Sequence, residues 1–275
     1  FYIRDLRRHV YWSAAYKPVM HPYQHFKVVH GIGYSKFIQQ VEDIASELTV
    51  FVSANDPVEI FKLTLTNLSQ ETRELDVTSY AEWLLGFAPD EHREFHKLFI
   101  TTSADVPERA VYARKCLWGF ADDKGRHNNV DWPYTAFMAV SEPLKSFDCD
   151  KESFIGLYHN DDKPQAMFEP QLAGRSGRFT DAIAALQVAV TLEPFASKTI
   201  VFTLGAAQDG QEDAGEFIRL YTSTEGSERA FQQVQAFWSR FIDTEVVETP
   251  DEALNFMTNT WLKYQSISCR LWGKS

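Results

Sequence analysis

A polar segment at residues 125–133 carries the side-chain types that bind sugars. Its candidates for substrate binding are Arg126, His127, Asn128, Asp131 and Trp132. Aromatic rings pack against the apolar C–H faces of a sugar, while fixed donors and acceptors bind its hydroxyl groups. Long loops on a rigid scaffold often carry function. The alternative is that Trp132 packs beneath the loop and the charged groups are simply solvated, and residue types alone favour that alternative.

A glycine-rich turn at residues 174–178 holds a second pair of candidates. Arg175 and Arg178 lie in this turn, on either side of Gly177. Backbone N–H groups and guanidinium groups together are able to bind an anion. No helix is predicted directly after the turn, as a phosphate-binding loop would require. An ordinary turn is therefore the favoured interpretation, with weak anion binding as the alternative.

The sequence predicts neither a metal site nor a bound cofactor. His92 and His96 are four residues apart, a spacing that suits metal binding on a helix, but no third ligand accompanies them. The turn from His30 to Ser35 contains two glycines but lacks the third glycine and the following helix of a dinucleotide-binding loop. We therefore expect surface histidines and a compact turn at these positions.

The composition predicts a folded, acidic protein. Hydrophobic residues make up 44% and aromatic residues 14% of the 275 residues, which is ample for a core. The 38 acidic and 27 basic residues leave a net charge of −11, so nucleic acid and anionic membrane surfaces are not expected partners. No apolar run approaches the roughly 20 residues of a membrane-spanning helix. The scattered Cys116, Cys149 and Cys269 argue against a disulfide framework or zinc cluster and favour a reducing, cytoplasmic location.

The elements that must position these residues are mostly strands. In residues 47–86, apolar and polar residues alternate in three runs separated by two turns, which predicts a three-stranded meander within one sheet of a sandwich. The same period predicts strands at 111–120, 134–140 and 154–158, and a hairpin of the opposing sheet at 183–204. After Gly205 the period changes to about 3.6, which predicts helices. We expect a β-sandwich at residues 1–208 and a helical segment at 209–275.

The helical segment is strongly apolar. A third helix, after two at 217–221 and 230–241, is predicted with Thr249 as its N-cap and Glu252 completing a capping box. Its apolar stripe consists of Leu254, Met257, Trp261, Tyr264 and Leu271. A helix with such a stripe is stable against a partner surface. We therefore expect either a further domain downstream or a tight interface.

The order of motifs along the chain resembles a known family. The motifs lie at residues 12–13, 30–37, 44–52, 56–58, 65–69, 78–86, 173–177, 184–187 and 249–272, and include His30-Gly31-x-Gly33-Tyr34-Ser35 and Tyr80-Ala81-Glu82-Trp83. In this order they resemble the N-terminal β-sandwich of the cellobiose-phosphorylase-type glycoside phosphorylases, glycoside hydrolase family 94 (formerly glycosyltransferase family 36). Within the family the resemblance is to the phosphorylase-like region of cyclic β-1,2-glucan synthases and to β-1,2-oligoglucan phosphorylases.

The resemblance implies a mainly β fold, namely a large antiparallel two-sheet sandwich (a supersandwich, galactose-mutarotase-like) followed by C-terminal α-helices. In the family these helices link to an α/α barrel that carries the catalytic Asp, so no catalytic residue is expected in this chain. Inorganic phosphate is implied as co-substrate of the parent enzyme, where it attacks the anomeric carbon with inversion. The implied partners are a β-glucan oligosaccharide, the C-terminal α/α-barrel catalytic domain and, in a homodimer, a second copy. Segment 125–133 is our candidate for a loop at the sugar site.

Two other functions remain open at this point. A free-standing carbohydrate-binding module would bind sugar through Trp132. A mutarotase-like sugar epimerase would use His30 or His127 with a carboxylate as acid and base, although neither histidine has a carboxylate partner in strand register. We predict a non-catalytic sandwich and linker portion of an inverting glycoside phosphorylase or glucan synthase that acts on β-linked, and specifically β-1,2, glucans.

Overall fold

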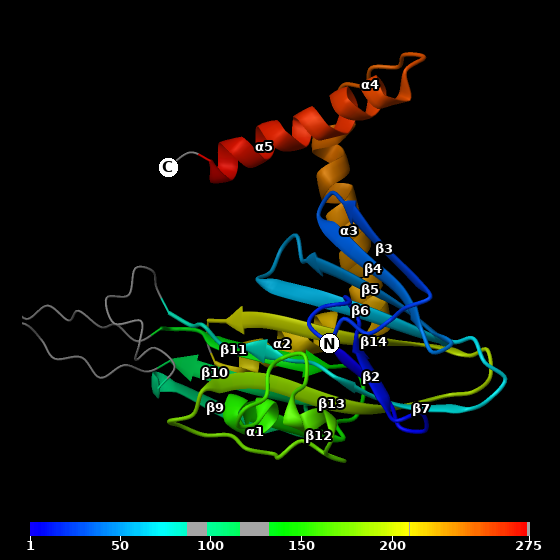
Figure 1. Cartoon of the computed structure of the whole chain (residues 1–275). Helices are drawn as coiled ribbons and strands as arrows, with labels where there is room; N and C mark the ends of the chain where they lie inside the picture. Colours follow the sequence, from blue (N-terminus) through cyan, green and yellow to red (C-terminus); the bar gives the residue numbers. More distant parts are fainter. Residues whose placement is uncertain (87–97, 116–131, 209, 274–275) are drawn as a thin grey trace, which may run out of the picture.

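Two antiparallel β-sheets form the body of the protein in this computed structural model, which describes residues 1–86, 98–115, 132–208 and 210–273 (Figure 1). The smaller sheet has the order β12 (Ser146–Asp150), β13 (Ala182–Leu192), β7 (Arg73–Thr78), β1 (Tyr2–Asp5) and β2 (Val10–Ser13), with β8 (Ala81–Glu82) paired to β13. The larger sheet has the order β3 (His25–Gly31), β4 (Tyr34–Val41), β5 (Ile44–Val52), β6 (Val58–Asn67), β14 (Ser197–Ala207), β11 (Thr135–Val140), β10 (Ala110–Lys115) and β9 (Ile100–Asp105). The mainly β sandwich predicted from the sequence is confirmed.

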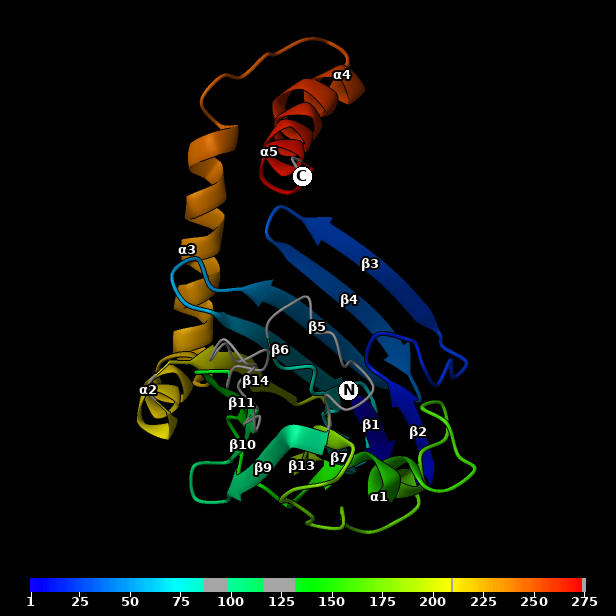
Figure 2. The same cartoon turned by 90° about the vertical axis from the view of Figure 1, so that its left-hand side faces the viewer.

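The main core lies between the two sheets. It contains the alternating residues that the period of two predicted to be buried, among them Leu48, Leu63, Leu65, Leu75, Val77, Leu186, Val188, Ile200 and Phe202. The opposite faces of several of the same strands are also buried, because helices cover them. Figure 2 shows β3 and β4 of the larger sheet projecting beyond the smaller one, and no residue of β3 is fully buried.

Helices cover the outer faces of both sheets. On the smaller sheet lie α1 (Lys151–Ile155) and a 3₁₀ turn (Gln165–Met167), whose Phe154 and Met167 are buried with Ile183 of β13. On the larger sheet lie α2 (Gln211–Tyr221) and the first half of α3 (Thr224–Ile242). The prediction of a strand at 154–158 is wrong: the Asp150 carboxylate accepts a hydrogen bond from the Glu152 N–H and starts a short helix there.

The predicted meander at 47–86 is confirmed in its first pair, β5 with β6, but is wrong in its second. The predicted hairpin at 183–204 is also wrong in its pairing. β6 belongs to the larger sheet and β7 to the smaller, and likewise β13 and β14 lie in opposite sheets. The two connections cross between the sheets at the same corner. There the Asn67 side-chain amide donates to the carbonyls of Glu71, Leu192 and Glu193, at 2.7, 3.1 and 3.1 Å. One buried amide thus holds both crossings together.

The last helices extend away from the sandwich. β14 ends at Ala207 and α2 begins at Gln211, so strands give way to helices where the sequence period changes, while the division into domains at 1–208 and 209–275 stays a prediction. α4 (Glu252–Phe256), a π-helical turn (Met257–Trp261) and α5 (Leu262–Trp272) lie at the far end of α3 (Figure 1). The predicted cap is wrong by two residues, because the Asp251 carboxylate rather than the Thr249 hydroxyl accepts from the first N–H groups of α4.

Candidate functional site

Most of the predicted sugar-binding segment lies outside the described residues, as do the paired histidines His92 and His96. This applies to four of its candidates, Arg126, His127, Asn128 and Asp131. Trp132 is described: its ring is half-buried against the main core, with its centroid 5.2 Å from that of Tyr134. The backbone N–H of Trp132 donates to the Lys115 carbonyl at 3.3 Å. Trp132 therefore packs at the edge of the core, and sugar binding by this segment stays a prediction.

The two arginines of the glycine-rich turn have different surroundings. Arg175 donates to the Asp150 carboxylate at 3.0 Å, the same side chain that caps α1, so its guanidinium already has an anionic partner. Arg178 instead lines a cavity of about 200 Å³ together with Arg114 of β10. The sequence analysis did not single out Arg114. Arg114 could have been found from the alternation of the predicted strand. It comes two residues after Tyr112, which puts both side chains on one face.

The turn is attached to the edge of the larger sheet. The Gly177 N–H donates to the Thr102 hydroxyl at 3.0 Å, and the Thr102 N–H donates to the Gly177 carbonyl at 2.8 Å. Gly177 has a φ of 127°, a backbone conformation that favours glycine. These bonds fix the main chain next to Arg178 on β9, and so determine which strand residues the arginine meets.

The epimerase alternative finds no support at His30. Its Nδ1 atom lies 2.9 Å from the Ser35 hydroxyl across the β3–β4 turn, and the ring is exposed. An acid–base pair for sugar epimerisation needs a carboxylate, and within residues 1–86, 98–115, 132–208 and 210–273 none is hydrogen-bonded to His30. The same described residues contain no group of three or more His, Cys, Asp or Glu placed to hold a metal ion.

A larger cavity of about 390 Å³ lies between the β9–β10 turn and α2. Its charged lining residues include Glu108, Arg109 and Arg219. Glu108 accepts a hydrogen bond from the Tyr112 hydroxyl, and Arg109 donates to the Ser141 carbonyl. Burial first, and then this bond to Glu108, raise the pKa of Tyr112. Glu108 and Arg109 are thus already satisfied by the protein, which points to structural roles at this cavity.

The C-terminal helices carry the largest set of exposed apolar side chains in the described part of the chain. We call the following group the C-terminal apolar surface: Phe237, Phe241, Val246, Leu254, Phe256, Met257, Trp261 and Leu262, with exposed fractions from 41% to 67%. The sequence analysis identified Leu254, Met257 and Trp261 from their helical spacing. It missed Phe256 and Leu262, because they lie outside a single helical stripe. Exposed apolar side chains gathered in one part of the chain are typical of an interaction site.

The attachment of these helices to the sandwich is narrow. Trp238 of α3 packs over Gly33 in the β3–β4 turn, and its ring lies 6.5 Å from that of Tyr264 on α5. Among the described residues, no helix is sufficiently long and apolar to cross a membrane.

Comparison with known proteins identifies the family. The model of the glycosyl hydrolase 94 supersandwich domain matches residues 1–224, and the model of the glycosyl hydrolase 94 superfamily catalytic domain matches residues 237–275. The cyclic beta-(1,2)-glucan synthase NdvB of Rhizobium meliloti (strain 1021) is 29% identical over 91% of this chain and 8% of its own length. Solabiose phosphorylase and 3-O-beta-D-glucopyranosyl-beta-D-glucuronide phosphorylase, both of Paenibacillus borealis, are 28% and 27% identical over 100% and 97% of the chain.

The alignments cover nearly all of this chain but only part of each relative. The chain spans 34% and 33% of the two Paenibacillus borealis phosphorylases, so about two thirds of each lies outside the alignment. Nevertheless the supersandwich model alone covers most of this chain, and the resemblance inferred from the order of motifs is confirmed. The chain belongs to the glycosyl hydrolase 94 family and contains its supersandwich domain.

Proposed function

We propose that this chain is the sandwich and linker portion of an inverting glycoside phosphorylase or glucan synthase that acts on β-linked glucans. In this proposal it has no catalytic acid of its own and needs no cofactor. A C-terminal α/α-barrel domain supplies the acid, and inorganic phosphate is the co-substrate. The sandwich supports contacts within a cytoplasmic homodimer, and segment 125–133 contributes to the sugar site.

The observation that carries the proposal is the position of the C-terminal apolar surface. Its residues, Phe237 to Leu262, fall within the segment that matches the catalytic-domain model, residues 237–275. Exposed side chains such as Phe256, at 61%, and Leu262, at 52%, have a hydration cost that a packed domain would remove. At roughly 25 cal/mol per Å² of apolar area, burying eight such side chains would contribute several kcal/mol to docking.

The relatives support the substrate class. Three of the curated relatives of this chain are a cyclic beta-(1,2)-glucan synthase and two phosphorylases of glucosides. The name of the synthase specifies the β-1,2 linkage. We therefore assign β-1,2-glucan oligosaccharides as the first substrates to test.

The proposal is tested by supplying the α/α barrel of a family phosphorylase, fused after Ser275 or added as a separate domain. The expected result is phosphate-dependent release of glucose 1-phosphate from a β-1,2-glucan oligosaccharide, with none from the chain alone. Phe256→Ser with Trp261→Ser should weaken association of the two parts, measured by sedimentation. Phe195→Ser is the matched control, because Phe195 is equally exposed, at 65%, but lies on the β13–β14 turn. A folded, associated barrel without activity would argue against the proposal.

Calorimetry distinguishes the module alternative. If the isolated chain bound β-glucan oligosaccharides tightly, and Trp132→Ala abolished that binding, the chain would be a free-standing carbohydrate-binding module. Under our proposal the isolated chain binds such oligosaccharides weakly or not at all, because the remainder of the sugar site is on the barrel. Light scattering of the same preparation tests the homodimer.

A further inference from the structure

The cavity beside the glycine-rich turn brings together two arginines that are far apart in the sequence. Arg114 comes from β10 and Arg178 from the turn attached to β9. Thr101 and Ser103 of β9 and Gln211, the first residue of α2, complete its polar lining. The strand register places Thr101 opposite Arg114 and Ser103 opposite Tyr112, so all four side chains lie on the same face of the larger sheet.

Both guanidinium groups lack a partner within the described part of the chain. Neither Arg114 nor Arg178 forms a hydrogen bond or ion pair with the described residues, whereas Arg175, three residues before Arg178, is paired with Asp150. In a protein with a net charge of −11, carboxylates to pair with arginine are abundant. Both side chains are exposed, so water solvates them when no ligand is bound. Two unpaired guanidinium groups that line one cavity supply the positive charge and the donors that an external anion needs.

Among the described residues, no acidic side chain lines this cavity. The carboxylates on the neighbouring turn have partners of their own: Glu108 accepts from the Tyr112 hydroxyl, and Asp105 accepts from the Glu108 N–H at 3.0 Å. Glu212 and Asp213 lie in the first turn of α2, but neither lines the cavity. An anion entering between Arg114 and Arg178 therefore meets donor groups and no lining carboxylate.

We infer that this cavity binds a phosphate group, as inorganic phosphate or as a phosphate monoester. Guanidinium groups bind phosphate with paired, charge-assisted hydrogen bonds, and the Thr101 and Ser103 hydroxyls and the Gln211 amide add donors from other directions. Donors that converge from several elements suit a tetrahedral oxyanion better than a planar carboxylate. A volume of about 200 Å³ is small for a drug-sized ligand but is suitable for a small anion.

The site is independent of the proposed function. It is built from β9, β10, the glycine-rich turn and the start of α2, and uses no residue of the C-terminal apolar surface. Phosphate binding here is expected in the isolated chain, with or without an added barrel. A failure of the barrel experiment would leave this inference intact, and the reverse also holds.

The test is isothermal titration calorimetry of the 275-residue chain with inorganic phosphate and, separately, with glucose 1-phosphate. Saturable binding is expected, and Arg114→Gln or Arg178→Gln should weaken it at least about tenfold each, since each removes a charge-assisted hydrogen bond. Ser103→Ala should weaken it a few-fold without changing the charge. Arg7→Gln is the matched control: it removes the same charge from an exposed position on the β1–β2 turn and should leave binding unchanged.

The two probes distinguish the sources of the phosphate group. Tighter binding of glucose 1-phosphate would identify a monoester site, and tighter binding of the free ion would identify an inorganic phosphate site. The inference is overturned if the unaltered chain shows no saturable binding of either probe. It is also overturned if binding in the Arg114→Gln, Arg178→Gln double variant equals that of the Arg7→Gln control. Circular dichroism confirms that each variant is folded.

Discussion

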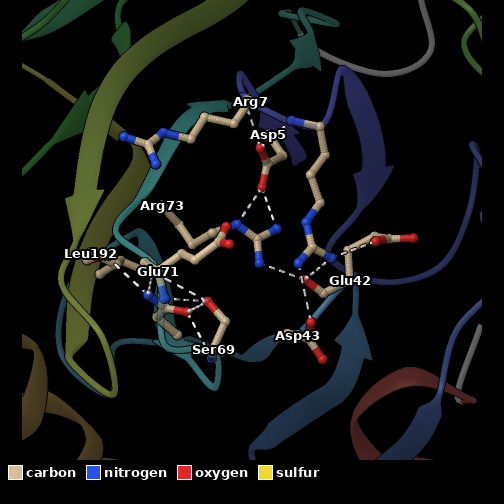
Figure 3. A network of polar contacts seen from close by, with 10 residues as sticks. Asp5, Arg7, Glu42, Asp43, Ser69, Glu71, Arg73 and Leu192 are labelled. Atoms are coloured by element: carbon tan, nitrogen blue, oxygen red, sulfur yellow. Dashed lines mark hydrogen bonds and ion pairs between the residues drawn. The ribbon is translucent and has the colours of Figure 1, made fainter.

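The buried ion pair between Asp5 and Arg73 links β1 and β7 of the smaller sheet, and Arg73 also donates to a turn of the larger sheet. Removing Arg73 should therefore destabilise the sandwich strongly. The two side chains are 0% and 1% exposed. The Arg73 Nε atom donates to Asp5 Oδ2 at 2.7 Å, Nη2 donates to the same oxygen, and Nη1 donates to the Glu42 carbonyl at 2.7 Å (Figure 3). Asp5 belongs to the smaller sheet and Glu42 to the β4–β5 turn of the larger one.

The loss in free energy of unfolding depends on the buried polar groups that each substitution leaves without a partner. Asp5 Oδ1 also accepts from the N–H groups of Arg7 and Arg8 at 2.9 and 2.8 Å, so in Arg73→Met that oxygen keeps its partners. Oδ2 would lose both donors while remaining out of water. Removing one member of a buried ion pair costs about 3–5 kcal/mol, which is a large part of a typical domain stability of about 5–15 kcal/mol.

Urea denaturation, followed by circular dichroism, measures the effect. With an m-value of roughly 2–3 kcal/mol/M, the midpoint of Arg73→Met should fall by about 1–2.5 M. Adding Asp5→Asn keeps the Oδ1 acceptor and removes the remaining buried charge, so the double variant should be more stable than Arg73→Met alone. Arg8→Met is the control, because Arg8 pairs with Glu42 at the surface, where such pairs contribute about 0–1 kcal/mol.

The reasoning would be refuted if Arg73→Met cost no more than Arg8→Met. It would also be refuted if the effects of Asp5→Asn and Arg73→Met were simply additive. Either result would mean that the buried pair contributes little to the stability of the sandwich.

Three further predictions concern the helices and the cysteines. Gly33 has a φ of 81°, and a Cβ added there would lie 2.4 Å from Trp238 Nε1. Gly33→Ala should therefore displace α3 and increase the hydrogen exchange of its backbone amides. Unchanged exchange would contradict the packing of Trp238 over Gly33. Tyr221→Phe removes a hydroxyl that donates to a carboxylate in the β5–β6 turn and should cost about 1–2 kcal/mol in urea, whereas a loss near zero would indicate that water replaces the bond. Burial raises the pKa of Cys149 to about 12, and Cys269 is exposed, so iodoacetamide at roughly pH 8 should label Cys269 before Cys149 in the native protein. Equal labelling rates, measured by mass spectrometry of the peptides, would contradict the burial of Cys149.

The sequence predicted the strands well because their alternation is local. Leu63 and Leu65 are buried between the sheets, as a period of two requires, and so are Leu75 and Val77. Helices at 217–221 and 230–241 were likewise predicted from their period of 3.6, and the structure extends both of them toward the N-terminus, to 211 and 224. The segment around Phe154 was predicted as a strand but is a helix. A helix of five residues is too short to show a period, and a side-chain cap determines its conformation.

The pairing of β5 with β6 was predicted, but the crossings between the sheets were not, because alternation is the same whichever sheet a strand joins. A turn between two alternating runs is compatible with a hairpin or with a crossing between sheets. The structure contains two crossings, β6 to β7 and β13 to β14, secured by the buried Asn67 amide. The hydrogen bonds of Asn67 join residues more than 120 positions apart, as with Leu192. Such partners leave no pattern in a local window of sequence.

The sequence by itself determined the fold class, the family and the apolar character of the last helices, since these depend on composition, local period and the order of motifs. Only the tertiary structure decided which strands share a sheet, that Arg175 is paired with Asp150, and that Arg178 meets Arg114 instead. The physical reason is that electrostatic and hydrogen-bonding partners are selected by distance in space. That distance is fixed only when the two sheets pack against each other.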